Sequence, residues 1–191
     1  MTKITGIEEH TRKLLIELGV DLENENFKDT PKRVARMYTE IVYPKKFRDN
    51  LIKEILSKTF PSKYSGMIIS SGIRTYSLCG HHFLPIVLDV VIGYIPSEKV
   101  LGLSKLARLA DIVAKQPLIQ EDYTEEIADK MEGILRPQGV GVYVSGLHYC
   151  QTMRGIKQRN AIMTTTSLRG IFMDATVKQE FMDKVYANKE E

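Results

Sequence analysis

Cysteine and histidine side chains gather in two short clusters, and their types point to metal chemistry. Cys79-Gly80-His81-His82 forms one cluster and His148-Tyr149-Cys150 the other, and together they hold both cysteines and three of the four histidines. Zn²⁺ favours thiolate sulfur and imidazole nitrogen, and a catalytic zinc takes three protein ligands and leaves one position open for water. The clusters therefore predict a metal site with five candidate ligands for three places.

The spacing inside each cluster fits this interpretation. His148 and Cys150 lie two apart at the end of an expected strand, whose period of two points both side chains to one face. Gly80 permits a sharp turn that aims its neighbours at one centre. If the first and third strands end at the same rim of the sheet, the two clusters meet there. The alternatives are a buried cysteine with ordinary histidines, or a Cys79–Cys150 disulfide, which a reducing compartment disfavours.

Cations at a helix start suggest a second kind of chemistry. Ser104 is a natural N-cap, and Lys105 and Arg108 lie three apart on one helical face. A helix N-terminus with two cations favours phosphate, although a capped helix with solvated charges explains the same residues. Three arginines on other segments could converge with these cations on a polyphosphate: Arg33, Arg36 and Arg154.

An amide and a carboxylate, Gln120 and Glu121, follow Pro117 at the opening of another expected helix. A carboxylate there is favoured by the helix dipole, so capping is a sufficient explanation of the pair. The functional alternative is that the amide and the carboxylate read the N–H and carbonyl edge of a purine. The sequence pattern leaves both explanations open.

Helices and strands in a mixed order must position these residues. Apolar residues at helical spacing predict helices, and β-branched runs predict strands. The expected helices are 7–18, 31–41, 50–58, 104–115, 122–135 and 176–186. The expected strands are 67–71, 86–95, 140–144 and 161–167. The order is helices, then β-β-α-α-β-β, then a helix, which indicates an α+β fold with a four-stranded antiparallel sheet.

Length and composition bound the other possibilities. The 191 residues suffice for one substantial domain, and we expect a helical region over 1–60 followed by a catalytic domain over 61–191. A net charge of +3 without a long basic run argues against nucleic-acid binding. We expect a soluble cytoplasmic protein without membrane contact, because no apolar stretch could span a bilayer and the start lacks the apolar core of a signal peptide.

Taken together, the motifs resemble type I GTP cyclohydrolase, the zinc enzyme of pterin synthesis. They follow the family's order and spacing over most of the chain. One such motif is weak evidence, whereas six in register are highly specific. The motifs are Asp-Thr-Pro-Lys-Arg-Val-Ala from Asp29, Cys79-Gly80-His81-His82, Gly-Leu-Ser-Lys-Leu-Ala-Arg from Gly102, Gln120-Glu121, His148-Tyr149-Cys150 and Arg154-Gly155.

The resemblance implies a fold, an assembly and a ligand set. The fold is the tunnelling fold, in which each subunit gives four antiparallel strands and two helices to a ring. Two pentameric rings stack into a homodecamer. By likeness, Cys79, His82 and Cys150 hold Zn²⁺, and His81 and His148 stay free for proton transfer.

The resemblance also implies how GTP is bound. Gln120 and Glu121 would hold the guanine edge, and Ser104 would lie near the ribose and help to open it. The triphosphate would be gripped by cations from separate segments, some of them from a neighbouring subunit. These are Lys105, Arg108 and Arg154, together with Arg33 and Arg36.

The implied reaction converts GTP and water to 7,8-dihydroneopterin 3'-triphosphate and formate. Zinc lowers the pKa of a bound water, which can then attack C8 of guanine. His81 is placed to protonate the departing imidazole nitrogen, because histidine titrates near neutral pH. A second hydrolysis releases formate, and rearrangement of the ribose closes the pterin ring. This is the first step toward folate or tetrahydrobiopterin.

The chain departs from the family pattern at Gly80, where glutamate is usual, so a carboxylate beside the metal is missing. Loss of such a group can lower metal affinity or rate by ~10–100-fold. Asp122 replaces an arginine, and Ser145-Gly146 replaces an acidic residue and alanine. The alternatives are a shifted guanine-nucleotide substrate, a role in a 7-deazaguanine pathway, or a paralogue that binds nucleotide without turnover.

Overall fold

The computed structural model describes residues 4–187, which form two compact units. The first unit ends at Lys45 and the second begins at Lys46. The first consists of α1 (Ile4–Glu17) and α2 (Thr30–Ile41), which pack against each other. The expected domain boundary after residue 60 stays a prediction.

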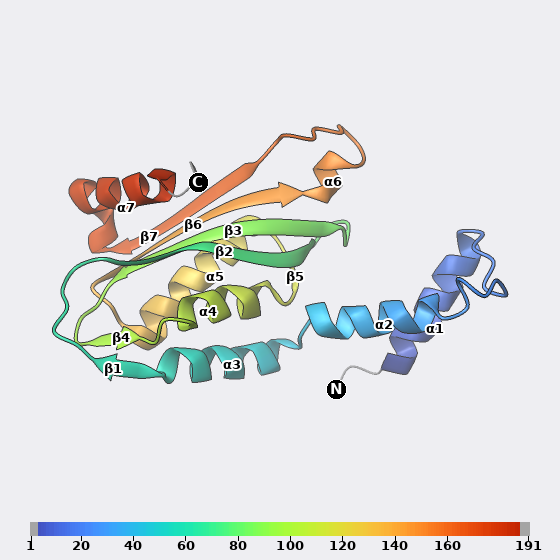
Figure 1. The fold of residues 1–191 in the computed structure, drawn as a ribbon, viewed down its shortest axis with the longest axis horizontal. Coiled ribbons are helices and arrows are strands. Elements are labelled where there is room, and N and C mark those ends of the chain that lie inside the picture. The colour runs from blue at the N-terminus through green and yellow to red at the C-terminus, as the bar shows by residue number, and fades with distance from the viewer. Residues whose placement is uncertain (1–3, 188–191) are drawn as a thin grey trace. The chain divides into compact units, whose positions relative to one another are not determined.

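A five-stranded sheet forms the centre of the second unit (Figure 1). The strands lie in the order β5-β2-β3-β6-β7, and every neighbouring pair is antiparallel except β5 with β2. Each of the four long strands overlaps a predicted segment, and the short β5 is an addition to the predicted four-stranded sheet. The strands are β2 (Ile68–Cys79), β3 (Pro85–Ile95), β5 (Pro117–Leu118), β6 (Gly139–His148) and β7 (Met163–Gly170).

The first long strand, β2, extends well beyond the predicted 67–71. A bulge between Ser70 and Ile73 accommodates Gly72, whose φ is +67°. Beyond the bulge, buried and exposed residues alternate, but Thr75 and Ser77 are polar residues at buried positions. The side chains of this strand therefore alternate in burial but not in hydrophobicity. A search for alternating hydrophobic residues does not detect such a strand.

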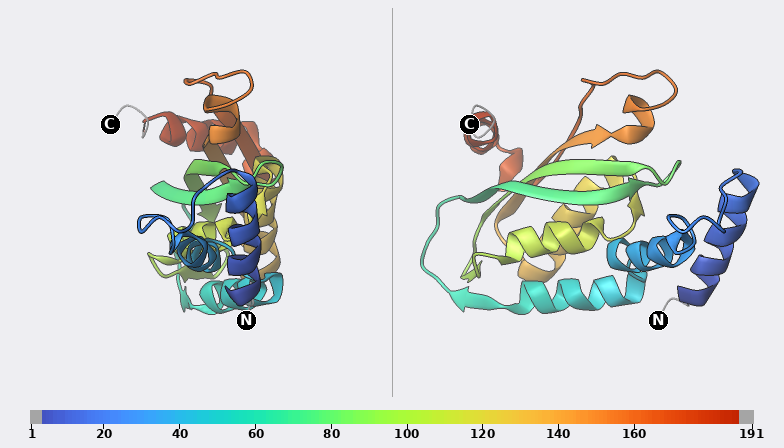
Figure 2. Two further views of the ribbon diagram at one scale, coloured as in Figure 1. Left: turned by 90° about the vertical axis from the view of Figure 1, so that its right-hand side faces the viewer. Right: turned by 45° about the vertical axis from the view of Figure 1, so that its right-hand side comes forward.

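Helices cover both faces of this sheet (Figures 1 and 2). α4 (Lys105–Ala114) and α5 (Gln120–Lys130) lie on one face, and α7 (Ala175–Ala187) lies on the other. A π-helical turn over Met131–Leu135 continues α5. No helix within residues 4–187 is long and apolar enough to cross a membrane.

Shorter elements complete the second unit. α3 packs Ile52 and Leu56 into the core on the α4 side. β1 pairs antiparallel with β4 in a two-stranded ribbon that the sequence pattern did not signal, because three residues are too few to show a period. The bounds are α3 (Lys45–Ser57), β1 (Thr59–Pro61), β4 (Lys99–Leu101), α6 (Tyr149–Thr152) and a 3₁₀ turn over Ile171–Met173.

Apolar cores lie on both faces of the sheet. The larger core joins strand residues such as Ile92 to Leu109 of α4 and Ile127 of α5. The smaller core holds Phe172 and Phe181 against the opposite face. Burial of these side chains ties the helices to the sheet, because removing apolar surface from water is the main favourable term in folding.

The sheet topology brings the two cysteine and histidine clusters to one rim. β2 and β6 are both antiparallel to β3, so both end at the same edge of the sheet. Ile86 of β3 pairs with Ser77 of β2 on one side and with His148 of β6 on the other. The residues that follow Ser77 and His148 therefore emerge next to each other.

Candidate functional site

The tight loop between β2 and β3 presents Cys79 and His82. The backbone N–H of Phe83 donates to the Cys79 carbonyl, and that of Cys79 donates to the Leu84 carbonyl, both at 2.8 Å. Phe83 adopts a left-handed conformation with φ of 55°, which closes the turn. Cys79 is buried, whereas His82 is exposed. The loop thus fixes one ligand in the protein and leaves the other next to solvent.

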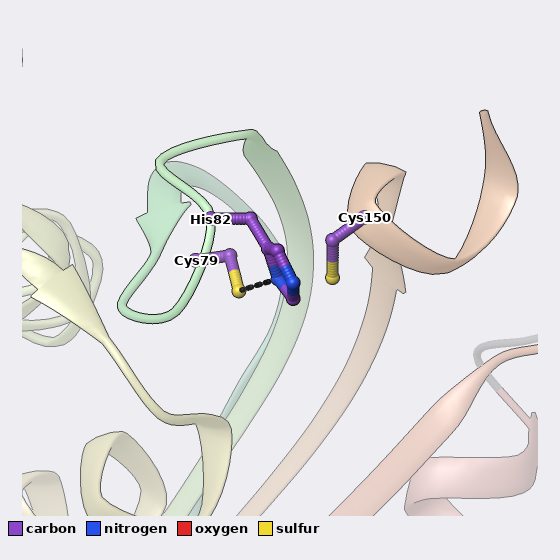
Figure 3. Close-up of side chains that lie close together, drawn as sticks. All are labelled: Cys79, His82 and Cys150. Carbon is purple, nitrogen blue, oxygen red and sulfur yellow. Dashed lines mark hydrogen bonds between the residues drawn. The ribbon is translucent and has the colours of Figure 1, made fainter. Parts of the chain in front are cut away.

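Cys150 reaches the same rim of the sheet from another segment of the chain. It lies in α6, which begins immediately after β6, and its side chain is partly buried. In Figure 3 its sulfur stands beside the His82 ring, on the other side of that ring from the Cys79 sulfur. Both cysteines are free thiols, so the disulfide alternative is not realised.

The three side chains form a group that can hold a metal ion. The ligand atoms of Cys79, His82 and Cys150 all lie within 4.8 Å of one another. Cys79 Sγ lies 3.7 Å from His82 Nδ1. A sulfur and a nitrogen bound to one tetrahedral zinc would be separated by about 3.6 Å, from the usual bond lengths of about 2.3 and 2.1 Å. The donor types and the Cys79–His82 spacing therefore fit zinc.

Electrostatics in the group also favour a cation. Burial raises the pKa of the Cys150 thiol, and the adjacent Cys79 raises it further. Two thiols this close resist ionisation, since a second negative charge would lie next to the first. A bound cation reverses this effect and stabilises both thiolates.

The two other histidines of the sequence clusters, His81 and His148, lie at the same rim of the sheet. His81 Nδ1 is 4.0 Å from Cys79 Sγ, and its ring is exposed. His148 Nε2 is 2.8 Å from Oε1 of Gln120. Burial lowers the pKa of His148, and the nearby Glu121 carboxylate opposes this decrease. A neutral, hydrogen-bonded imidazole next to a metal group is suited to proton transfer.

Gln120 and Glu121 begin α5 at the same rim, but their environments differ. Gln120 is 1% exposed and its amide is hydrogen-bonded inside the protein, whereas Glu121 is exposed. The first backbone N–H groups of a helix have no partner within it. This helix start therefore offers backbone donors and one solvent-facing carboxylate next to His148.

The cations at the start of α4 lie away from the metal-binding group. Ser104, Lys105 and Arg108 line a groove of about 510 Å³ between α3 and α4. Ser104 occupies the N-cap position, but its hydroxyl makes no capping hydrogen bond. The ten-residue α4 is about 15 Å long, and its other end leads to β5, which pairs with Cys79 (Figure 1). Convergence of these cations with the metal group is not found within the described residues of one chain.

The remaining arginines lie on two other segments. Arg154 follows α6 and is exposed. Arg33 and Arg36 are exposed on α2 in the first unit, where Arg33 lies 3.8 Å from Asp29. Asp29 stands at the N-cap position of α2 without a side-chain capping bond. Of these three arginines, only Arg154 lies in the second unit, where it follows the helix α6 that carries Cys150.

Comparison with known proteins decides the family. The sequence model of GTP cyclohydrolase I matches residues 7–186. The chain belongs to the GTP cyclohydrolase I family. A protein named GTP cyclohydrolase 1 from Aquifex aeolicus (strain VF5) is 40% identical over 180 residues, which are 94% of this chain and 95% of the relative.

Other relatives carry the same name. The GTP cyclohydrolase 1 of Hydrogenobaculum sp. (strain Y04AAS1) is 43% identical, with coverage of 88% of this chain and 91% of the relative. That of Clostridium perfringens (strain 13 / Type A) is 42% identical, with coverage of 88% and 89%. A weaker likeness, with a TM-score of 0.45 and 16% identity, links 57% of this chain to 96% of the solved apo structure of the archaeosine synthase QueF-Like.

Two supporting residues of the site cannot be found by sequence reasoning. The Leu118 carbonyl accepts a hydrogen bond from Gly80 N–H at 2.9 Å and so anchors the metal loop. Thr165 Oγ1 lies 3.2 Å from Nε2 of Gln120. Neither residue carries a sequence signal, since a backbone carbonyl is present in every residue and threonine is common in strands. Both become visible only through tertiary contacts.

Proposed function

We propose that this chain hydrolyses GTP to 7,8-dihydroneopterin 3'-triphosphate and formate, the first step of pterin synthesis. The observation that carries the proposal is the convergence of Cys79, His82 and Cys150 within 4.8 Å at the rim that also holds His81 and His148. Family membership supports the same reaction. The site thus combines a metal-binding group with two histidines for proton transfer.

The metal is proposed to be zinc, held by Cys79, His82 and Cys150. Two thiolates and one imidazole are soft ligands that suit zinc and leave a fourth position for water or substrate. When bound, zinc supplies a Lewis acid that activates water at neutral pH. We propose that the protein acts in the cytoplasm, where disulfides are rare and cysteines close to histidine commonly bind metal.

The proposed roles of the nearby side chains follow from their positions. His81 is exposed beside the metal group and protonates the departing imidazole nitrogen of guanine. His148, the last residue of β6, transfers a second proton. Glu121 accepts hydrogen bonds from the N–H groups of guanine, and Gln120 contributes its backbone N–H at the helix start. The Gln120 side chain is already engaged within the protein.

The triphosphate is proposed to be bound across subunits. Ser104, Lys105 and Arg108 line a groove at the end of α4 away from the metal group, so we assign them to the site of a neighbouring subunit. Ser104 assists ribose opening there, and its hydroxyl makes no capping bond that would compete. The cations proposed to complete the grip are Arg154, Arg33 and Arg36.

The assembly is proposed to be a homodecamer of two stacked pentameric rings with the tunnelling fold. β5 pairs with β2 only at Leu78 and Cys79, so most of β2 forms an edge of the described sheet, and β7 forms the other edge. Open edges carry unpaired backbone groups and favour pairing with another chain. Pairing of β2 with β7 of the next subunit would close a ring.

Turnover by the purified, zinc-loaded protein tests the proposed function. GTP, a deoxy analogue and a modified guanine nucleotide are supplied separately, and formate release and pterin fluorescence after oxidation are measured. We expect both products from GTP in equal amounts. Turnover of an analogue alone would support a shifted substrate. Nucleotide binding without any turnover would support a non-catalytic paralogue and reject the proposal.

A further inference from the structure

The buried amide of Gln120 has an orientation that its partners determine. Its Nε2 lies 3.3 Å from the Val144 carbonyl and 3.1 Å from the Met163 carbonyl. Carbonyl oxygens only accept, so these two contacts require the NH₂ end of the amide. Oε1 must therefore be the atom that faces His148, and the alternative flip would put an oxygen against two carbonyl oxygens.

A short hydroxyl chain supports the same orientation. Thr124 Oγ1 donates to the Gln120 backbone carbonyl at 2.9 Å, which commits its proton. Thr165 Oγ1 then donates to Thr124 Oγ1 at 2.6 Å. The Thr165 oxygen is left as an acceptor, 3.2 Å from Nε2 of Gln120. Every neighbour of the nitrogen thus accepts, and the amide cannot flip without losing several bonds.

This orientation determines which nitrogen of His148 carries the proton. Gln120 Oε1 only accepts, so His148 Nε2, 2.8 Å away, must be the donor. A neutral imidazole holds one proton, and with that proton on Nε2 the other nitrogen, Nδ1, is a proton acceptor. The bond to Gln120 persists when Nδ1 takes up a second proton, because Nε2 donates in both states.

Gly146 provides the space for this contact. A Cβ at position 146 would lie 2.0 Å from Gln120 Oε1 and 3.1 Å from His148 Nε2. Gly146 and His148 are two apart on β6, so they share one face of the strand. In this structure the amide oxygen thus lies where a Cβ at position 146 would stand, and the glycine leaves that position open to it.

The geometry points to Gln120 as a positioning residue whose side-chain amide holds His148 with its proton on Nε2 and Nδ1 free to accept. This inference rests on the proposed function, in which His148 transfers a proton. It assigns the Gln120 side chain to the histidine and leaves guanine recognition to Glu121 and the backbone.

The direct test reads the histidine ring without turnover. Zinc-loaded, full-length protein labelled with ¹⁵N-histidine is studied by magic-angle-spinning NMR, and a His148→Asn variant assigns the His148 signals. We expect a protonated Nε2 and a bare Nδ1 in the unsubstituted protein. A His148 signal with the proton on Nδ1 would overturn the inference. An unsubstituted protein that is inactive on GTP would instead reject the proposed function, and the ring measurement would still decide the present inference.

One variant tests the dependence on Gln120. In Gln120→Met we expect the His148 signals to shift toward a mixture of tautomers, and kcat to fall by ~10–100-fold while zinc content and KM stay within about twofold. Ser145→Ala, whose side chain points to the other face of β6, is the matched control. A raised KM with unchanged kcat and unchanged His148 signals would overturn the inference. If Gln120→Met fails to fold, the ring measurement on the unsubstituted protein gives the decision.

Discussion

Gly80 donates its backbone N–H to the carbonyl of Leu118 at 2.9 Å, and this bond ties the metal loop to β5. The contact needs no glycine. A Cβ at position 80 would lie 3.4 Å from the Leu118 oxygen, which is ordinary contact, and Gly80 is not among the residues with positive φ. Neither the backbone conformation nor the space around position 80 therefore requires a glycine there.

We predict that Gly80→Glu folds and improves the site. A carboxylate beside the metal loop can orient a ligand or a histidine, and groups of this kind are worth ~10–100-fold in metal affinity or rate. Zinc affinity by chelator competition and kcat with GTP are the measurements. Gly80→Gln is the control of equal size. If both variants gain equally, charge is not the cause, and if neither gains, the chain has no need of a carboxylate there.

Removal of Cys150 should abolish zinc binding and turnover together. Cys150→Ala leaves two of the three proposed ligands, and a catalytic zinc site needs three protein ligands. Metal content by mass spectrometry and formate release are measured on the same preparation. Tyr149→Phe, at the exposed neighbouring position, should retain both properties. Stoichiometric zinc with full activity in Cys150→Ala would refute the ligand assignment.

The two remaining histidines of the rim should separate metal binding from catalysis. His81→Ala and His148→Ala are expected to keep zinc while kcat falls by about 10²–10⁴-fold, the usual contribution of a general acid or base. His10→Ala, in α1 of the first unit, is the matched control and should leave kcat unchanged. Loss of zinc from His81→Ala would show that this histidine is a ligand instead.

The sequence predicted the parts of the site that depend on local chemistry. Thiol and imidazole types identify a metal group. The expectation that His148 and Cys150 lie on one face of a strand was wrong, because β6 ends at His148 and Cys150 lies in α6. The β-β-α-α-β-β order then places the ends of the first and third long strands at one rim. These inferences need only residue type, spacing and the alternation of antiparallel neighbours.

The rest of the site depends on distances that spacing along the chain does not encode. β5 has two residues, Pro117 and Leu118, and no period can be read from two residues. Lys105 and Arg108 stand in a typical phosphate-binding motif, but only the direction of α4 reveals that they lie away from the metal group. The amide orientation of Gln120 follows from carbonyls on two strands, β6 and β7.

Phe172 packs closely against Gly141, so we predict that a larger residue at position 141 lowers the stability of the protein. A Cβ there would lie 2.5 Å from Cδ1 of Phe172 and 3.1 Å from Cε1 of Phe181. Such overpacking costs about 1–3 kcal/mol, so Gly141→Ala should lower the Tm by about 2–4 °C for each kcal/mol. Gly133→Ala, with nothing within 4 Å of its Cβ, is the control. Phe172→Leu in the Gly141→Ala background should restore part of the loss, and an unchanged Tm would contradict the packing argument.

A shared active site predicts that two inactive variants complement each other. Cys150→Ala removes a metal ligand, whereas Arg108→Ala removes a phosphate-binding cation from the groove between α3 and α4. If the groove of one subunit serves the metal group of the next, a mixed oligomer contains some sites in which neither residue is replaced. Co-expressed and co-purified variants should then release more formate than either variant alone.

The control for complementation is a pair of variants within one proposed half-site. Cys150→Ala and His82→Ala both remove ligands of the same metal group, so every mixed site retains a defect and no activity should return. Arg108→Ala should also keep its zinc, because its groove lies at the other end of α4. Activity of the Cys150→Ala and Arg108→Ala mixture at the level of its separate components would contradict a site shared between two subunits.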